Sequence, residues 1–239
     1  MPVLTYDGVL VDPDGNEAPS LRDIALAMSR MPRFAGHTRR WYSVLDHSLF
    51  VAQMAIEEAD LKAHEVLALL LHDAHEALTG DVPTHFKPNE LRALQKKLDR
   101  IIVKAHYGNQ QELWDAQSPL IKQYDQRALA AEAMVIGAPR WGTMPRALFI
   151  EQAGSLPREE DMVSLRHYLY VGVLSNPQML IHNEEAPNVK RLVWRILELQ
   201  GKAESFLHPM AQPDARCVTD ATGDCVSPVE CMHGPGVEP

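Results

Sequence analysis

The residues with the clearest chemical signal are His72 and Asp73, which stand side by side in the middle of an apolar stretch. Burying an unpaired imidazole and carboxylate there costs on the order of several kcal/mol. A divalent cation satisfies both groups, because histidine offers a nitrogen and aspartate an oxygen to the same ion. The alternative is a hydrogen-bonded core histidine beside a helix-end carboxylate. A second histidine, His47, lies on the apolar face of the preceding predicted helix and favours the metal site.

Three ligands do not complete such a site, so a further carboxylate is expected from a later helix. Asp125 lies in mid-helix, one turn from an apolar residue on each side, and this periodicity turns it inward. An exposed mid-helix aspartate is an equally good interpretation of the same pattern. Asp99 is the competing candidate, although its neighbours Lys96 and Arg100 indicate a solvated face.

Glu76 follows His72 by four residues and Asp73 by three, which places the three side chains on one helical face. A carboxylate beside two metal ligands can accept a proton from an attacking water molecule. The alternative is a solvated glutamate at a helix end. His75, in the same stretch, has three open interpretations: a second metal ligand, a proton shuttle or a surface residue.

The elements that must position these residues are predicted to be helices. Residues 1–20 alternate apolar and polar side chains and end in turn formers, which predicts a short hairpin or extended arm. Ser20, with Asp23 three residues later, predicts the start of the first helix. Helical periodicity then recurs in segments 21–31, 44–54, 63–78, 89–108, 118–137, 157–174 and 188–207.

These segments predict an all-α bundle of six or seven helices, with no strand after residue 20 and with sites between facing helices. Segment 44–54 places Val44, His47, Val51 and Met54 on one face. Segment 63–78 is apolar nearly all round, which suits a central buried helix. Ser118 is expected to cap the helix that carries Asp125, with Pro119 at its first position. Gly108 and Gly137 are expected to end helices.

The bulk properties restrict the class of protein. The chain has 239 residues and a formal net charge of −9, so length favours one main domain and charge disfavours duplex nucleic acid as a partner. We find no membrane-spanning run and no secretory signal, which predicts a cytoplasmic protein without a membrane partner. We divide the chain into a domain at 1–206 and a Pro/Gly-rich flexible tail at 207–239. The spacing of the tail's Cys217, Cys225, Cys231 and His233 matches no tight zinc-binding pair.

Taken together, these motifs resemble the HD-domain metal-dependent phosphohydrolases over roughly residues 20–140. The separated His47, the His72–Asp73 doublet and the later Asp125 match the H…HD…D ligand set of that family. The resemblance is closest to the branch of bacterial 5′-deoxynucleotidases and phage dATP triphosphohydrolases. It is carried by "RF" at 33–34, "YSVLDHSLFVA" at 42–52 and "HDAHEALTGDVPTHFK" at 72–87.

The resemblance implies roles for further residues. Glu76 matches the acidic residue that orients or deprotonates the attacking water, and Asp81 matches a carboxylate near the nucleophile or the sugar. Asp81 is also well explained as a turn residue in "TGDVP". Arg33 matches a phosphate-binding arginine, and Phe34 stands where an aromatic residue neighbours the substrate. Lys87 is a further substrate-binding candidate.

The function expected from the resemblance is hydrolysis of a (deoxy)nucleotide phosphate ester, most simply of a deoxynucleoside monophosphate. One alternative is a triphosphohydrolase that releases triphosphate from a dNTP, and another is a catalytically silent metal-binding interaction module. The ligand set of histidine and carboxylate without cysteine fits Co, Mn, Fe, Ni or Zn, with Mg as a further option. The expected partner is a small-molecule nucleotide, and the resemblance raises a homo-oligomer as one assembly.

Overall fold

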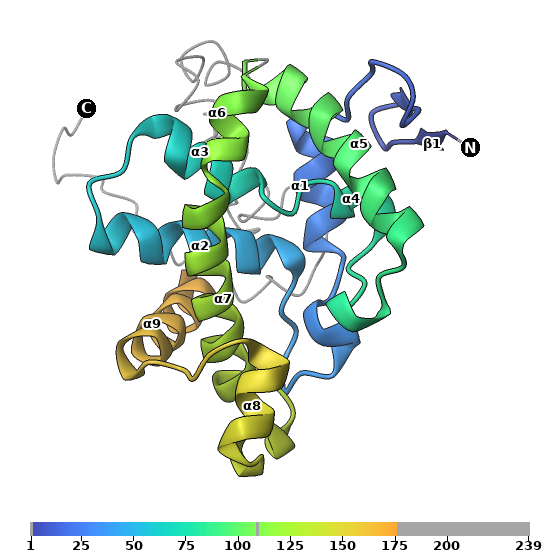
Figure 1. Cartoon of the computed structure of the whole chain (residues 1–239). Helices are drawn as coiled ribbons and strands as arrows, with labels where there is room; N and C mark the ends of the chain where they lie inside the picture. Colours follow the sequence, from blue (N-terminus) through green and yellow to red (C-terminus); the bar gives the residue numbers. More distant parts are fainter. Residues whose placement is uncertain (1, 109, 176–239) are drawn as a thin grey trace, which may run out of the picture.

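The computed structural model describes residues 2–108 and 110–175. A short antiparallel hairpin opens the chain, with β1 (Val3–Leu4) paired to β2 (Leu10–Val11). The remaining elements of the described residues are helical, as Figure 1 shows. The all-α architecture with a short N-terminal hairpin, expected from the sequence, is therefore confirmed.

The α-helices follow one another with short connections. Their bounds are α1 Leu21–Ser29, α2 Val44–Glu58, α3 Ala63–Leu71, α4 Glu76–Thr79, α5 Asn89–His106, α6 Gln111–Ala116, α7 Ser118–Val135, α8 Arg146–Ala153 and α9 Glu159–Ser175. Three 3-10 turns complete the set: η1 Arg33–Gly36, η2 Thr84–Phe86 and η3 Pro139–Thr143.

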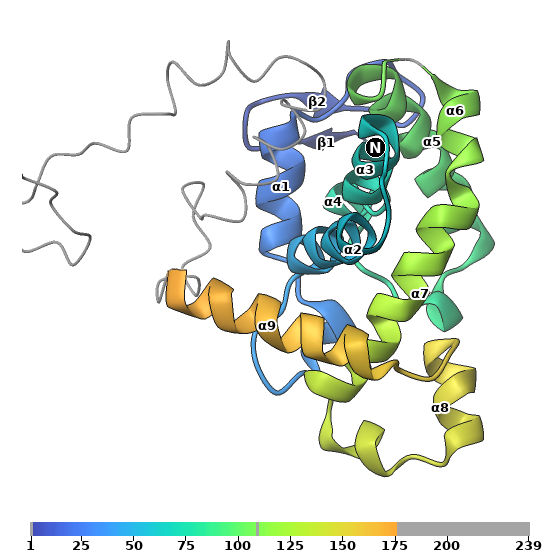
Figure 2. The same ribbon diagram turned by 90° about the vertical axis from the view of Figure 1, so that its left-hand side faces the viewer.

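Helix α2 is the centre of the bundle. It packs against α1, α3, α7 and α9, and Figure 2 shows it enclosed by these neighbours. The predicted apolar face is confirmed, because Val44, His47, Val51 and Met54 are all buried. Apolar side chains of α3 and α7 extend this core. Residues far apart in the sequence thus meet where α2, α3 and α7 come together.

Several details differ from the sequence-based expectation. The single helix expected over 63–78 is two helices, because α3 ends at Leu71 and α4 begins at Glu76. Helices α6 and α8 were not expected. Ser118 is the first residue of α7, and Gln117 takes the cap position. The number of helices over the described residues therefore exceeds the six or seven expected.

Other expectations about helix ends are confirmed. Ser20 accepts a hydrogen bond from the backbone of Asp23, and the two residues form a capping box at α1. Gly108 adopts φ +72° beyond α5, a conformation that favours glycine and ends the helix. The predicted helix at 188–207, the division at residue 207 and the cysteines of the tail lie outside the described residues. None of the described helices is long and apolar enough to cross a membrane.

Candidate metal centre

Helix α2 supplies His47 from its first turn. Ser43 caps this helix: its hydroxyl accepts from the backbone of Asp46, and the Asp46 carboxylate accepts from the Ser43 backbone. The cap fixes where the helix begins and therefore which side chain the first turn directs inward. His47 is fully buried there. Its Nδ1 lies 2.7 Å from Oε1 of Glu132.

His72 and Asp73 stand in the turn between α3 and α4, at the point where the apolar helix ends. The Nδ1 of His72 lies 2.8 Å from the backbone carbonyl of Leu69. Because a carbonyl only accepts, His72 donates from Nδ1, so in the neutral ring Nε2 is the nitrogen that keeps a lone pair. The end of α3 therefore fixes both the direction and the tautomer of this imidazole.

Helix α7 supplies Asp125 and Glu132, which are two turns apart on one face. The Oδ1 atom of Asp125 lies 3.0 Å from Nε2 of His47. Glu132 is completely buried and also accepts a hydrogen bond from the hydroxyl of Tyr42. The sequence analysis missed Glu132. Its spacing of seven residues from Asp125, among alanines, was the available signal.

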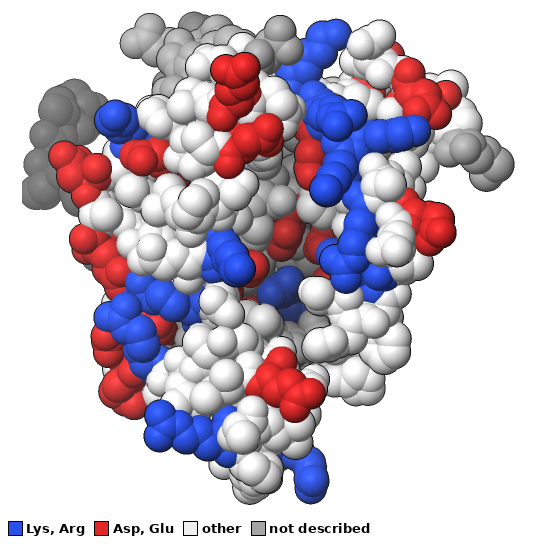
Figure 3. Space-filling model, in the orientation of Figure 1, with Lys and Arg blue, Asp and Glu red and all other residues white. Residues whose placement is uncertain are grey.

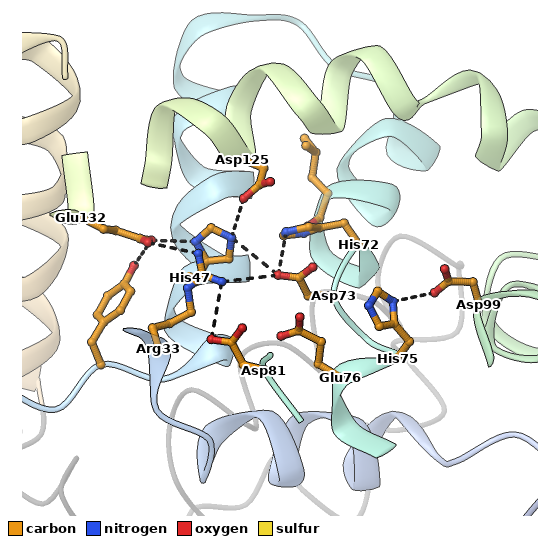
Figure 4. Close-up of polar contacts among 12 residues, drawn as sticks. Arg33, His47, His72, Asp73, His75, Glu76, Asp81, Asp99, Asp125 and Glu132 are labelled. Carbon is orange, nitrogen blue, oxygen red and sulfur yellow. Dashed lines mark hydrogen bonds and ion pairs between the residues drawn. The ribbon is translucent and has the colours of Figure 1, made fainter. Parts of the chain in front are cut away.

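Three of the four predicted ligands, His47, His72 and Asp73, offer atoms within 4.8 Å of one another, and Asp125 lies beside His47, as Figure 4 shows. Nε2 of His72 lies 3.1 Å from Oδ2 of Asp73, and Nε2 of His47 lies 3.7 Å from the same oxygen. Among the described residues, neither Nε2 atom has a hydrogen-bond partner, although both are buried. Two lone pairs and two carboxylates around one point form a donor set that fits a divalent cation.

The electrostatics of the cluster agree with that fit. Burial and Arg33 lower the pKa of His47, but Glu132 and Asp125 raise it by a larger amount. The pKa of His47 is therefore about 10, above its ordinary value. Burial raises the pKa of Asp73, yet the neighbouring histidines and Arg33 hold it well below its usual range. Without a cation, the carboxylates thus keep protons on the imidazoles. A bound cation would replace those protons, as metal binding to histidine generally does.

Arg33 lies beside the four ligands and is buried. Its guanidinium nitrogens are 3.5 Å from Oε2 of Glu132 and 4.0 Å from carboxylate oxygens of Asp73 and Asp81. Burial lowers its pKa, but these carboxylates raise the pKa above its ordinary value. Asp81 and Arg33, predicted from separate segments, are thus brought together at this cluster.

Phe34 follows Arg33 in an unusual backbone conformation. Both Phe34 and Ala35 have positive φ values, 55° and 50°, which side-chain-bearing residues seldom adopt. This conformation keeps the Phe34 ring near Arg33, with the guanidinium carbon 5.8 Å from the ring centroid. The ring also meets Trp141 of η3 edge to face, at 6.2 Å. Phe34 is therefore next to the cluster, as expected.

Glu76 begins α4 and is buried, so the alternative of a solvated glutamate is wrong. Its Oε1 accepts a hydrogen bond from Nζ of Lys87 at 3.1 Å, while Oε2 is buried without a partner among the described residues. Burial and the charges of Asp73 and Asp81 raise the pKa of Glu76 to about 7. Lys87 thus holds Glu76 in place.

His75 and Asp99 form a second polar pair next to the cluster. Nδ1 of His75 lies 2.8 Å from Oδ1 of Asp99. Asp99 lies beside exposed Lys96 and Arg100, as expected, but it is itself only partly exposed, since 25% of its side chain is accessible and its carboxylate contacts His75. Asp125, rather than Asp99, is the carboxylate beside His47.

The cluster opens to the surface. Figure 3 shows a hollow in the face that this view presents, with acidic and basic atoms visible at its base. The side chain of Asp125 is 42% exposed and that of Asp73 19%, so part of the cluster is accessible from the surface. Basic side chains also follow α5, to the right of the hollow.

Comparisons with known proteins agree with this geometry. A family model described as an HD domain matches residues 30–136. The protein described as uncharacterized protein YfdR, from Escherichia coli (strain K12), is 32% identical over 119 residues, which cover 49% of this chain. The match spans 61% of that relative. Both findings support an HD domain, the family model lies over the helices that carry the cluster, and HD domains are in general metal-dependent hydrolases.

Proposed function

We propose that His47, His72, Asp73 and Asp125 hold a divalent cation and that the site hydrolyses the phosphate ester of a deoxynucleoside monophosphate. One observation carries the proposal. Two buried histidines have their Nδ1 atoms occupied by acceptors, while their Nε2 atoms make no hydrogen bond among the described residues and lie 3.0–3.7 Å from carboxylate oxygens of Asp73 and Asp125. These two nitrogens are placed to share a cation with the carboxylates around them.

A cation bound there would polarise a phosphoryl oxygen and lower the pKa of a bound water molecule, towards about 7 in the strongest cases. Glu76 is the proton acceptor in this proposal. Its Oε2 atom is buried without a partner among the described residues, and the carboxylate lies beside Asp73, where it can accept a proton from a water molecule. Lys87 restrains the other carboxylate oxygen and so keeps Glu76 oriented.

Arg33 is the phosphate-binding residue in this proposal. Its guanidinium is held in place by Glu132 and faces Asp73 and Asp81. A positive group fixed in a buried site can offset the charge that develops on a phosphate in the transition state. Phe34 and Trp141 provide an aromatic surface beside Arg33, which suits a nucleobase or sugar.

A triphosphohydrolase is the second candidate, and the basic side chains of α5 favour it. Lys96 lies one turn before Asp99 and Arg100 lies next to it, and both are exposed. These charges could bind the outer phosphates of a dNTP. The monophosphate is preferred because the two cationic side chains near the ligands are already paired with carboxylates, Arg33 with Asp73 and Lys87 with Glu76. They are therefore not available for the outer phosphates of a triphosphate. Glu76 argues against a catalytically silent module, since metal binding alone needs no spare buried carboxylate.

The test is a panel of nucleoside and deoxynucleoside mono- and triphosphates, assayed with Mn²⁺, Co²⁺ and Mg²⁺ and with the products separated. The proposal predicts inorganic phosphate from a deoxynucleoside monophosphate. Triphosphate as the product, lost in Lys96→Ala or Arg100→Ala, would support the second candidate. Metal-loaded protein that releases neither product would exclude both activities.

A further inference from the structure

Four basic side chains form a line along the outer surface of α5. Arg92, Lys96, Arg100 and Lys104 follow one another at intervals of four residues, so they form one continuous row on the helix, and all four are exposed. With a rise of 1.5 Å per residue, the row is about 18 Å long. Figure 3 shows basic side chains gathered along α5, beside the hollow of the metal centre. We call these four residues the basic stripe.

The protein itself neutralises little of the charge of the basic stripe. Lys96 and Arg100 make no ion pair or hydrogen bond within the part of the chain that the structure describes. Lys104 donates to the amide oxygen of Asn16 at 3.0 Å, and Arg92 donates to a backbone carbonyl at 2.8 Å, so both of these acceptors are uncharged. The basic stripe is therefore a positive region on a chain whose formal net charge is −9.

A second hollow borders the basic stripe near the C-terminus of α5. Lys97, Arg100 and Lys104 line it on the side of the helix, and residues 13–16, after β2, line it on the other side. Its volume is about 270 Å³. Asp14 is the acidic residue of its wall and is paired with Lys97 at 2.6 Å. Three cations against one carboxylate favour an anionic group in this hollow.

An exposed aromatic ring stands at the opposite end of the basic stripe. Phe86, in η2, is 78% exposed, more than any other large apolar side chain in the part of the chain that the structure describes. The hydrogen bond from Arg92 to the carbonyl of Thr84 joins η2 to the first turn of α5. Lys87, the residue after η2, contacts Glu76 of the metal centre. This segment therefore connects the basic stripe to the metal centre.

A row of cations next to an exposed ring is a combination that binds single-stranded nucleic acid. The cations contact the phosphate backbone, and the ring offers a face on which an unpaired base can stack. A triphosphate has three adjacent phosphates and could contact only part of a row about 18 Å long. A membrane surface would need apolar side chains that enter the lipid, whereas every exposed residue of α5 is polar, charged or alanine.

We propose that the basic stripe and Phe86 bind single-stranded nucleic acid, with its backbone along α5 and one base stacked on Phe86. The contact of Lys87 with Glu76 places the Phe86 end of the strand beside the metal centre. The inference goes beyond the proposed function and requires no bound cation. Because the net charge of −9 disfavours binding over the rest of the surface, the strand is confined to the basic stripe.

The test measures binding by the full chain, stripped of metal and kept in a chelator. The probe is a fluorescent oligothymidylate of about twelve nucleotides, and its anisotropy reports binding. Four phosphate contacts predict that the logarithm of the binding constant falls with the logarithm of the salt concentration with a slope of about −3. Lys96→Ala combined with Arg100→Ala should weaken binding about tenfold or more and reduce the steepness of that slope by about 1.4.

Phe86 is tested by the size of its ring. Phe86→Ala should weaken binding about fivefold or more, because it removes the stacking surface. The salt dependence should stay the same, since no charge is lost. Phe86→Trp should restore the affinity. A duplex of the same length should bind more weakly than the single strand, because paired bases cannot stack on this ring.

Arg146→Ala combined with Arg166→Ala is the matched control. It removes two exposed cations from α8 and α9, and it should bind the oligonucleotide as the wild type does. Circular dichroism checks that each variant is folded. Equal losses in the control and in the α5 variant would overturn the inference, and so would a wild-type chain that binds no oligonucleotide at low salt.

The remaining outcomes separate the classes of ligand. A duplex bound as tightly as the single strand would contradict stacking on Phe86. Binding to phosphatidylserine vesicles without binding to the oligonucleotide would assign the basic stripe to lipid instead, and binding to dATP alone would assign it to a triphosphate. Because these measurements are made without metal, a failure of nucleotide hydrolysis does not affect them, and absence of oligonucleotide binding leaves the proposed function in place.

Discussion

Glu132 is a buried residue of the candidate site that contacts three functional or supporting side chains. Its carboxylate accepts from His47 and Tyr42 and faces Arg33 at 3.5 Å. Burial raises the pKa of Glu132, but His47 and Arg33 lower it by a larger amount. The carboxylate is therefore held ionised. Glu132 therefore sets the tautomer of a metal ligand and balances the proposed phosphate-binding arginine.

Replacement of this charge gives the first prediction. Glu132→Gln keeps the shape of the side chain but removes the charge, so we expect metal affinity at the first site to fall by about tenfold or more. Titration with Mn²⁺ or Zn²⁺ measures the change. Glu151→Gln, at an exposed position of α8, is the control and should bind as the wild type does. Equal affinities in the two variants would contradict the role assigned to Glu132.

The raised pKa of Glu76 gives a second prediction, for the metal-free protein. Burial and the charges of Asp73 and Asp81 raise that pKa from 4.5 to about 7. The folded state then binds a proton that the unfolded state has lost, so stability falls as pH rises from about 4.5 to about 7. Glu76→Gln should remove on the order of 1 to 3 kcal/mol of this dependence. Denaturant unfolding at several pH values measures it, and identical slopes would contradict the assignment.

At the level of residues, the sequence predicted those with a local signal. His47, His72 and Asp73 could be found because each interrupts an apolar pattern, and Asp125 because of resemblance and periodicity. Glu132 was missed because a glutamate among alanines is a common feature of exposed helices. Its partner His47 is 85 positions away in the chain. Only the packing of α7 on α2 shows that the two meet.

The N-terminus of α2 is the element that most directly controls the site. The Ser43–Asp46 capping box lies one turn from His47 and is buried. Helix α1 starts with an equivalent box between Ser20 and Asp23, but its residues do not contact the ligands in the bonds described. The chain thus offers two caps of the same kind, one near the site and one remote from it.

These caps give the third prediction. Ser43→Ala and Ser20→Ala should each lower the free energy of unfolding by about 1 kcal/mol, which is typical for loss of a serine cap. Only Ser43→Ala should also weaken metal binding, because the first turn of α2 holds His47. Thermal unfolding and metal titration of both variants provide the comparison. An equal effect of the two changes on metal affinity would show that the α2 cap does not position the ligand.

At the level of elements, periodicity predicted most helices and misjudged their ends. The break after Leu71 was not predicted because the apolar pattern continues beyond it, while the turn at His72–His75 depends on contacts with other segments. His75 meets Asp99 of α5, and Glu76 meets Lys87. Such contacts override local helix propensity. Helix α6 escaped prediction because it is too short to show a period.

At the level of the whole molecule, the helical bundle brings segments that are distant in sequence together around the candidate metal centre. η1, α2, the turn after α3 and α7 supply the ligands and Arg33, and α5 supplies Asp99. Every residue of the proposed cation site lies between Arg33 and Glu132, within the segment that matches the HD domain. The site therefore needs this bundle rather than any single helix.

The fourth prediction concerns the end of the chain. Deletion of residues 210–239 should leave metal content and nucleotide hydrolysis within about twofold of the full chain, because no described site residue lies beyond Trp141. Assays of purified full-length and shortened proteins under the same conditions measure this. An inactive shortened protein that is still folded would mean that the final segment takes part in function.

The measurement that tests the central claim most directly is phosphate release from a deoxynucleoside monophosphate by protein stripped of metal and then reloaded. We predict no release from the stripped protein and full recovery with Mn²⁺ or Co²⁺. We also predict no recovery in Asp73→Ala, which loses the carboxylate that lies within 4 Å of both His47 and His72. Unchanged hydrolysis by the stripped protein, or none by wild-type protein with metal bound, would contradict the account.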